Sequence, residues 1–151
     1  VGIGAGARNK MLKPNLLCEI LKLFIKKKNI KKVIFLGAGD RDEKYLNEIK
    51  KSVNFSDFNI ENLVNKVSLD ESVDIISKCQ YYLGFESGLF HIAASLKIKT
   101  YGIFTEINAF SHINWENVTL FSGSPSTSNS NEYFGNSKLN NISLEEIEKL
   151  L

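Results

Sequence analysis

The residues best suited to chemistry stand together near the middle of the chain, where Glu86, Ser87, Gly88 and His91 follow an apolar, β-prone run at 81–85. Apolar residues at helical spacing come after them, so the order is strand, turn and helix. The N–H groups at the start of such a helix have no acceptor within it and lie at the positive end of its dipole. Ser87 and His91, four residues apart, would share one face of the first turn. This stretch therefore predicts an anion site, with phosphate as its natural ligand.

A second glycine-rich turn opens the chain. Residues 2–7 formally match the G-x-G-x-x-G/A dinucleotide fingerprint, but the next helix begins only at Pro14. The fingerprint requires a helix that opens at once, so the match is weak. A long loop that carries Arg8 and Lys10 suits a diphosphate neutralised by side-chain charge. The alternative is an ordinary glycine turn with solvated lysines.

A third turn, at 37–39, follows another apolar run and is rich in acids on its far side. Asp40 is expected to cap the helix that follows. Asp42 or Glu43 could instead accept hydrogen bonds from a ribose diol, as acids after the strands of nucleotide-binding folds do.

The elements that must position these turns alternate along the chain, which predicts an α/β fold, a Rossmann-like parallel sheet with helices on both faces. Ligands bind such sheets at the carboxyl ends of the strands, where all three turns would open. Strands are expected at 1–3, 33–36, 62–64, 81–85, 99–104 and 118–121. Helices are expected at 42–52, 68–78 and 143–151, and two further helices are expected to begin at Pro14 and near Leu89. Two S-x-x-E capping signals, Ser68 with Glu71 and Ser143 with Glu146, mark the expected helix starts at Ser68 and Ser143.

Composition fits a single compact domain over 1–151, with 43% hydrophobic residues and a net charge of +2 that is too small to indicate nucleic acid. Cys18 and Cys79 are expected to be buried thiols in a reducing, cytoplasmic compartment, and no metal or cofactor site is expected. Five lysines at 26–32 suit a helix C-terminus, or alternatively an anionic membrane surface. Because the chain starts at Val1 within a strand-like segment, we interpret it as a fragment. His112 is expected to be a loop residue.

Residues 67–104 resemble the C-terminal half of family 9 glycosyltransferases, the ADP-heptose:lipopolysaccharide heptosyltransferases. The pattern of that family runs as S-L-x-E, an apolar strand, D-S/T-G-x-x-H-x-A-A and a further strand. This chain supplies the corresponding residues Ser68, Leu69, Glu71, Ser87, Gly88, His91, Ala93 and Ala94. The resemblance extends more loosely over most of the chain.

The resemblance implies the C-terminal half of a GT-B enzyme, a single nucleotide-sugar-binding domain whose N-terminal acceptor domain, with the catalytic base, is absent from this chain. The full-length protein would transfer a heptose or similar sugar, with inversion, from an ADP-heptose-like donor to a glycolipid at the cytoplasmic face of the inner membrane. This chain alone would bind donor and be inactive. By analogy, the diphosphate of the donor would contact backbone groups of Ser87, Gly88 and Leu89, the His91 imidazole and Lys10. The base would face Val67 and Ser68, and the ribose would face Asp42 or Glu43.

This sequence departs from the family pattern at two points. The acid before S/T-G is Glu86 instead of aspartate, and the loop motif K-x-W-P is replaced by a segment in which Lys10 and Lys13 both compete for the role of the lysine. Two other functions stay open on the sequence: another nucleotide-binding enzyme, such as a dehydrogenase or a sugar-nucleotide epimerase, and a non-catalytic interaction module.

Overall fold

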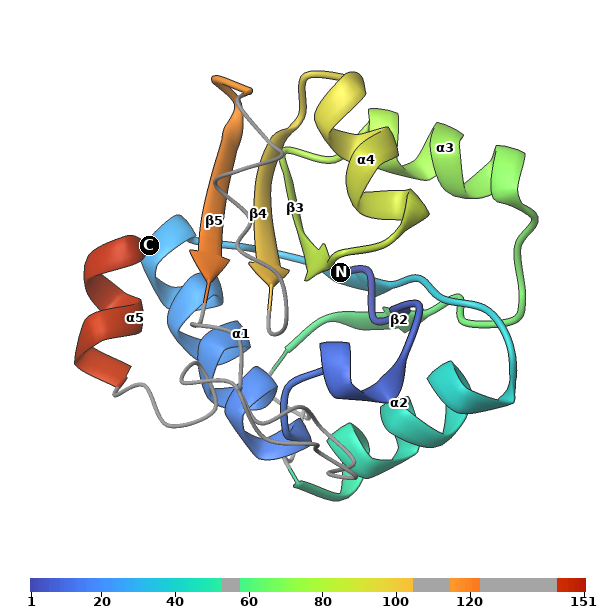
Figure 1. Cartoon of the computed structure of the whole chain (residues 1–151), viewed down its shortest axis with the longest axis horizontal. Helices are drawn as coiled ribbons and strands as arrows, with labels where there is room; N and C mark the ends of the chain where they lie inside the picture. Colours follow the sequence, from blue (N-terminus) through green and yellow to red (C-terminus); the bar gives the residue numbers. More distant parts are fainter. Residues whose placement is uncertain (53–57, 105–114, 123–143) are drawn as a thin grey trace.

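The structure is a computed structural model that describes residues 1–52, 58–104, 115–122 and 144–151. Figure 1 shows its helices and strands in chain order. The helices are α1 (Pro14–Lys28), α2 (Asp40–Ser52), α3 (Leu69–Ser77), α4 (Gly88–Ser95) and α5 (Leu144–Leu150), preceded by a 3-10 turn, η1 (Arg8–Lys10). The strands are β1 (Val33–Phe35), β2 (Ile60–Asn62), β3 (Tyr81–Phe85), β4 (Lys99–Phe104) and β5 (Val118–Ser122).

All of the strand pairings that the structure describes are parallel. β1 pairs with β2, and β4 lies between β3 and β5. Gly2 joins the two groups, because it forms parallel bridges to both Leu36 and Gly84. Counted along the chain with the Gly2 segment as the first strand, the order across the sheet is therefore 3-2-1-4-5-6. This is the order of a doubly wound nucleotide-binding sheet, whose topological switch point lies between the first and the fourth strand.

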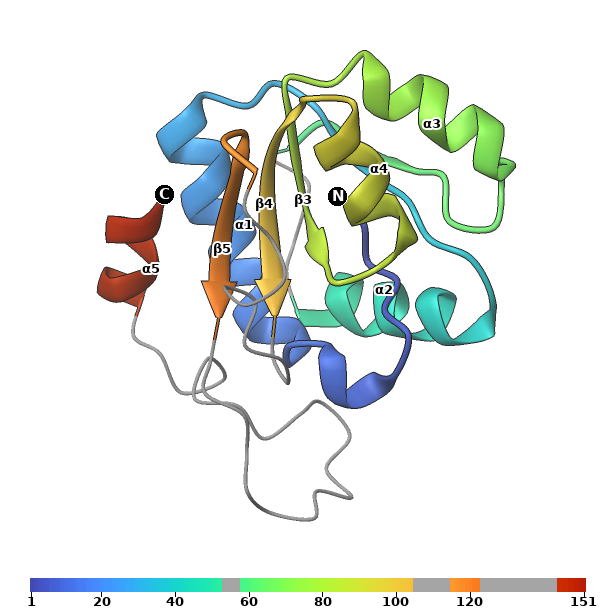
Figure 2. The same ribbon diagram turned by 45° about the horizontal axis from the view of Figure 1, so that its top comes forward.

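Helices cover both faces of this sheet, as Figures 1 and 2 show, with α1 and α5 on one face and α3 and α4 on the other. Side chains alternate between the two layers along a strand: Leu83 and Phe85 of β3 pack into the core around α1 and α2, while Tyr82 packs with Phe90 of α4. Each helix turns its apolar stripe toward the sheet, which buries it. The α/β fold expected from the sequence is thus confirmed.

Local sequence signals account for several of the helix ends. Pro14 takes the first position of α1, where its missing N–H costs nothing. Asn29 ends the same helix in the left-handed conformation, with φ 51°. Ser68 and Glu71 form the expected capping box at the start of α3.

Four expectations need correction or fall outside the described residues. α2 begins at Asp40, two residues earlier than expected, so Asp40 lies within the helix and is not its cap. β2 likewise lies two residues before the expected strand. His112 and the capping signal at Ser143 lie outside the described residues.

The lysines at the end of α1 are largely engaged within the molecule. Lys27 pairs with Glu148 of α5 at 2.9 Å, Lys32 pairs with Glu61 of β2 at 2.7 Å, and Lys31 donates to the side chain of Asn29. These contacts fasten α5 and β2 to neighbouring elements. Both cysteines are free thiols, Cys18 buried and Cys79 half-buried. Within the described segments, no helix is both long and apolar enough to cross a bilayer.

Candidate functional site

A cavity of about 560 Å³ opens at the carboxyl ends of the strands, beside the switch point. Its volume falls within the range typical of small-molecule sites. The three glycine turns line it, together with the start of α3. Every predicted site residue except Glu43 is among the lining residues, which are Gly4, Ala5, Gly6, Lys10, Gly37, Ala38, Arg41, Asp42, Val67, Ser68, Leu69, Ser72, Glu86, Ser87, Gly88, Leu89 and His91.

The turn between β3 and α4 forms one wall of the cavity. Ser87 has an extended backbone and caps α4, accepting a hydrogen bond on Oγ from the Phe90 N–H at 3.4 Å. The N–H groups of Gly88 and Leu89 belong to the first turn, where a helix offers no acceptor of its own. His91 is exposed on that turn, and its ring lies edge-on to Phe90 with centroids 5.1 Å apart. This wall therefore presents hydrogen-bond donors and an imidazole to the cavity.

Lys10 reaches this wall from the opposite side. Its Nζ lies 2.7 Å from Oε2 of Glu86, and the two side chains are 27% and 25% exposed. The contact joins residues 76 positions apart and crosses the switch point. Lys13, the other candidate lysine, is exposed at the start of α1 and does not line the cavity. Lys10 is therefore the lysine that the fold brings to this site.

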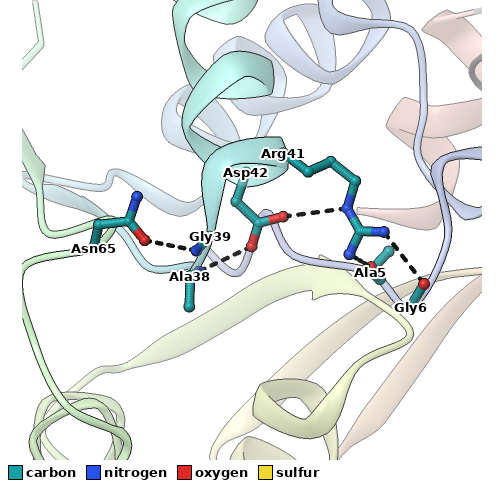
Figure 3. A network of polar contacts seen from close by, with 7 residues as sticks. All are labelled: Ala5, Gly6, Ala38, Gly39, Arg41, Asp42 and Asn65. Carbon is teal, nitrogen blue, oxygen red and sulfur yellow. Dashed lines mark hydrogen bonds and ion pairs between the residues drawn. The ribbon is translucent and has the colours of Figure 1, made fainter.

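Asp42 also lines the cavity, but it is only 3% exposed and its carboxylate is engaged by the fold. Oδ2 accepts a hydrogen bond from the Ala38 N–H at 2.9 Å, and Oδ1 lies 3.8 Å from Nε of Arg41 (Figure 3). Burial raises the pKa of Asp42, while the Ala38 N–H and the Arg41 guanidinium act to lower it. The carboxylate thus supports the turn from within.

The same carboxylate explains two of the glycines. A Cβ at Gly4 would lie 2.6 Å from Oδ2 of Asp42, and one at Gly37 would lie 2.8 Å from it. A real Cβ atom essentially never lies that close to another heavy atom, so any side chain at either position would displace the buried acid. Gly4 and Gly37 therefore let two turns close around Asp42.

Arg41 ties the glycine turn at 4–6 to the turn at 37–39. Its guanidinium donates to the carbonyl groups of Ala5 and of Gly6, the latter at 3.3 Å (Figure 3). Sequence reasoning did not place Arg41 in the site. A signal was present, however, because a cation in the first turn of a helix is unfavourable for the helix dipole and so calls for a tertiary partner.

Asn65, in the loop after β2, connects that loop to the turn at 37–39. Its Oδ1 accepts a hydrogen bond from the Gly39 N–H at 2.6 Å, and its Nδ2 donates to Oε2 of Glu43 at 3.2 Å. Glu43 is exposed and lies outside the cavity lining. Asn65 adopts a positive φ of 61°, a conformation in which asparagine is enriched.

Ser68 lines the cavity but serves the helix that it caps. Its Oγ accepts the Glu71 N–H, its own N–H donates to the Glu71 carboxylate at 2.7 Å, and its carbonyl accepts the Ser72 N–H. Val67 is half-buried beside it. Leu69, which is 63% exposed, adds an apolar surface at the rim that sequence reasoning missed.

The charged side chains of the lining balance. Lys10 and Arg41 are cations, and Asp42 and Glu86 are anions, each paired as described above. Together with the helix start and His91, these groups are suited to holding a phosphate and its charge. The described residues contain no group of three or more histidine, cysteine or acidic side chains that could hold a metal ion.

A second cavity, of about 330 Å³, lies at the opposite end of the sheet, near the amino ends of β1 and β3. Its lining is mainly apolar and includes Val1, Phe24 and Leu83. Because parallel sheets bind ligands at the carboxyl ends of their strands, the first cavity is the candidate site.

Comparison with known proteins places these features in a family. The family model described as glycosyltransferase family 9 (heptosyltransferase) matches residues 19–132. Lipooligosaccharide heptosyltransferase 2 from Campylobacter jejuni is 27% identical to the chain in a serotype O:2 strain and 28% identical in a serotype O:6 strain. Each alignment covers 85 residues, which is 56% of this chain and 27% of the relative. The match thus spans about a quarter of the length of these relatives.

Two solved structures share the fold. The ADP-heptose LPS heptosyltransferase II of E. coli superposes with a TM-score of 0.76 at 21% identity, and a family 9 glycosyl transferase of Veillonella parvula DSM 2008 does so with 0.74 at 17%. Each comparison covers 99% of this chain and 43% of the other. The chain therefore has the fold of one α/β part of these longer glycosyltransferases.

Proposed function

Because this chain belongs to glycosyltransferase family 9, we propose that it is the donor-binding part of a glycosyltransferase. In this proposal the chain holds a nucleoside diphosphate sugar in the cavity at the switch point. The acceptor and the general base come from a second, N-terminal domain of the full-length protein. This division agrees with the 43% of each solved relative that the chain covers.

The observation that carries the proposal is the set of groups that meet at the cavity. The start of α4, which carries the exposed His91, and the Lys10 ammonium meet there from two segments distant in the sequence. Each of them favours negative charge, through a helix dipole, a full positive charge or hydrogen-bond donation. A diphosphate is the part of a sugar donor that needs all three.

In the proposed complex the diphosphate contacts the N–H groups of Ser87, Gly88 and Leu89, with His91 and Lys10 beside it. The base packs near Val67 and against the exposed Leu69. The ribose faces the acids at the start of α2. Asp42 lines the cavity, and its Oδ1 has no hydrogen-bond partner among the described residues, whereas Glu43 lies outside the lining and already accepts a hydrogen bond from Asn65.

The chemistry of transfer follows from this arrangement. When the sugar leaves, negative charge builds up on the departing diphosphate, and donors already in place stabilise that charge. An acceptor hydroxyl loses its proton to a general base and attacks the anomeric carbon from the opposite side, which inverts its configuration. Since this chain supplies only the donor half, we expect it to bind nucleotide without transferring sugar.

The named relatives suggest the substrates. The similar proteins of Campylobacter jejuni are lipooligosaccharide heptosyltransferases, and the E. coli structure is an ADP-heptose LPS heptosyltransferase. We therefore propose ADP-heptose or a related ADP-sugar as donor and a glycolipid of the lipopolysaccharide type as acceptor, at the cytoplasmic face of the inner membrane. Direct membrane contact through the α1 lysines has weaker support, because Lys27, Lys31 and Lys32 have partners within the molecule.

A thermal-shift panel with ADP, UDP, GDP and NAD at millimolar concentration tests this function. A ligand that binds only the folded chain raises its melting temperature. We expect ADP to give the largest rise. A rise with NAD alone would favour a dehydrogenase, and no rise with any nucleotide would favour a non-catalytic module; either result would refute the proposal.

A further inference from the structure

The ion pair between Lys10 and Glu86 has a consequence for the proposed donor site, on which this inference rests. The two residues stand on opposite sides of the switch point, one in the loop after the first strand and one in the turn before α4. Their contact therefore crosses the place where the diphosphate would lie.

Lys10 and Arg41 are the cations that the described part of the chain places in the lining, and they are held differently. The Arg41 guanidinium is held by the carbonyl groups of Ala5 and Gly6 and lies beside the buried Asp42. The Lys10 ammonium, in contrast, meets one side chain among the described residues, the carboxylate of Glu86, which is a quarter exposed. An ion pair with that degree of solvation contributes little to stability, so a second anion can replace the carboxylate at small cost.

Glu86 and a diphosphate would compete for the same positive groups. The carboxylate stands one residue before Ser87, the cap of α4, and it already neutralises the ammonium that a phosphate would use. The single ammonium cannot be neutralised by both anions at close range, so a diphosphate must displace the carboxylate from Lys10 before it can use that charge.

We propose that Glu86 is an internal competitor of the donor's diphosphate, holding Lys10 until a diphosphate takes its place. Glu86 thereby weakens diphosphate binding through Lys10. The Arg41 and Asp42 contacts stay in place during this exchange, so only the Lys10 side chain and the Glu86 side chain need to move.

This competition also separates substrate from product by charge. A free nucleoside diphosphate ends in a phosphate whose second ionisation falls near pH 6, so at neutral pH it carries about one more negative charge than its sugar ester. Glu86 therefore disfavours the free diphosphate more strongly than the sugar donor. In a transferase this difference speeds the release of the product.

Isothermal titration of the chain with ADP and with ADP-glucose tests the proposal, using Glu86→Gln, Lys10→Met and the double variant. We expect Glu86→Gln to tighten ADP binding about fivefold and ADP-glucose binding about twofold. In the Lys10→Met background the same change should alter ADP affinity by less than about twofold, because no ammonium remains to be released. Glu61→Gln is the matched control: it also breaks a 2.7 Å pair with a lysine, away from the cavity, and should leave affinity unchanged.

Other outcomes would overturn the proposal. Weaker or unchanged ADP binding by a folded Glu86→Gln protein, as judged by an unaltered melting temperature, would contradict competition while leaving the proposed function intact. An equal gain in the Lys10→Met background would show that Glu86 acts by direct repulsion and not by holding Lys10. Absence of nucleotide binding by every variant and by the unaltered chain would refute the donor site and the competition together.

Discussion

Two parts of the cavity lining place a carboxylate beside a cation, and they are built in opposite ways. In the first part, which we call the inner network, Asp42 is buried and meets Arg41 and the Ala38 N–H. In the second, the bridging pair, Glu86 is a quarter exposed and meets only the flexible ammonium of Lys10.

The difference between them lies in what would happen if the contact broke. A buried carboxylate without its partners keeps the full cost of desolvation, so the inner network must stay closed for the turns to fold. A partly exposed pair returns to water at little cost, so the bridging pair can open. The comparison indicates that Asp42 fixes the shape of the cavity, whereas Glu86 controls access to its charge.

Substitution of the buried acid should have the largest effect on stability. Asp42→Ala leaves the Ala38 N–H without its acceptor and removes the anion beside Arg41, and we expect it to lower the free energy of unfolding by about 2–3 kcal/mol. Urea denaturation measures the loss. Asp40→Ala, in the same helical turn but exposed, is the control and should cost less than about 0.5 kcal/mol. A similar small loss for both variants would show that the inner network is not structural.

On the wall formed by the β3–α4 turn, His91→Ala should change binding and leave folding nearly untouched. The imidazole is exposed at the start of α4, so its removal opens no cavity in the core. Loss of one hydrogen bond to a charged group predicts ADP binding weaker by about tenfold, measured by titration calorimetry, with the melting temperature nearly unchanged. A large fall in melting temperature at unaltered affinity would make His91 a structural residue.

Glu71 is a third carboxylate, fully exposed, and its substitution should have the smallest effect on stability. The backbone N–H and hydroxyl of Ser68 lower the pKa of Glu71 below its usual value of 4.5. The ionised form is therefore favoured in the folded state, and its stabilising contribution, complete above pH 4.5, is lost as the pH falls through the lowered pKa. Denaturation at pH 6 and pH 3 should show that the stability difference between the unaltered chain and Glu71→Gln shrinks in acid. A constant difference would contradict the capping role.

Local signals made the wall around Glu86 predictable. The strand at 81–85, the turn and the helix follow one another within a few residues, and both strands of that unit have the bounds expected from the sequence. The Ser68 capping box was equally readable, because its two hydrogen bonds join residues three apart.

The inner network could not be predicted in the same way. Asp42 and Glu43 are adjacent acids, and only the tertiary fold decides that one is buried under two glycine turns while the other is exposed. Arg41 finds its carbonyl partners 35 and 36 residues away, in a loop whose position depends on the sheet order. The contact between Lys10 and Glu86 depends on that order as well, since it joins the first strand to the fourth.

Amide chemical shifts during titration with ADP show where on the chain the nucleotide binds, because each N–H reports its own surroundings. We predict that the largest shifts fall on Gly88, Leu89 and His91 at the start of α4 and on the loop that carries Lys10, with smaller shifts around Asp42. Shifts concentrated on the apolar cavity near Phe24 and Leu83, at the other end of the sheet, would contradict it, as would the absence of any shift at saturating ADP.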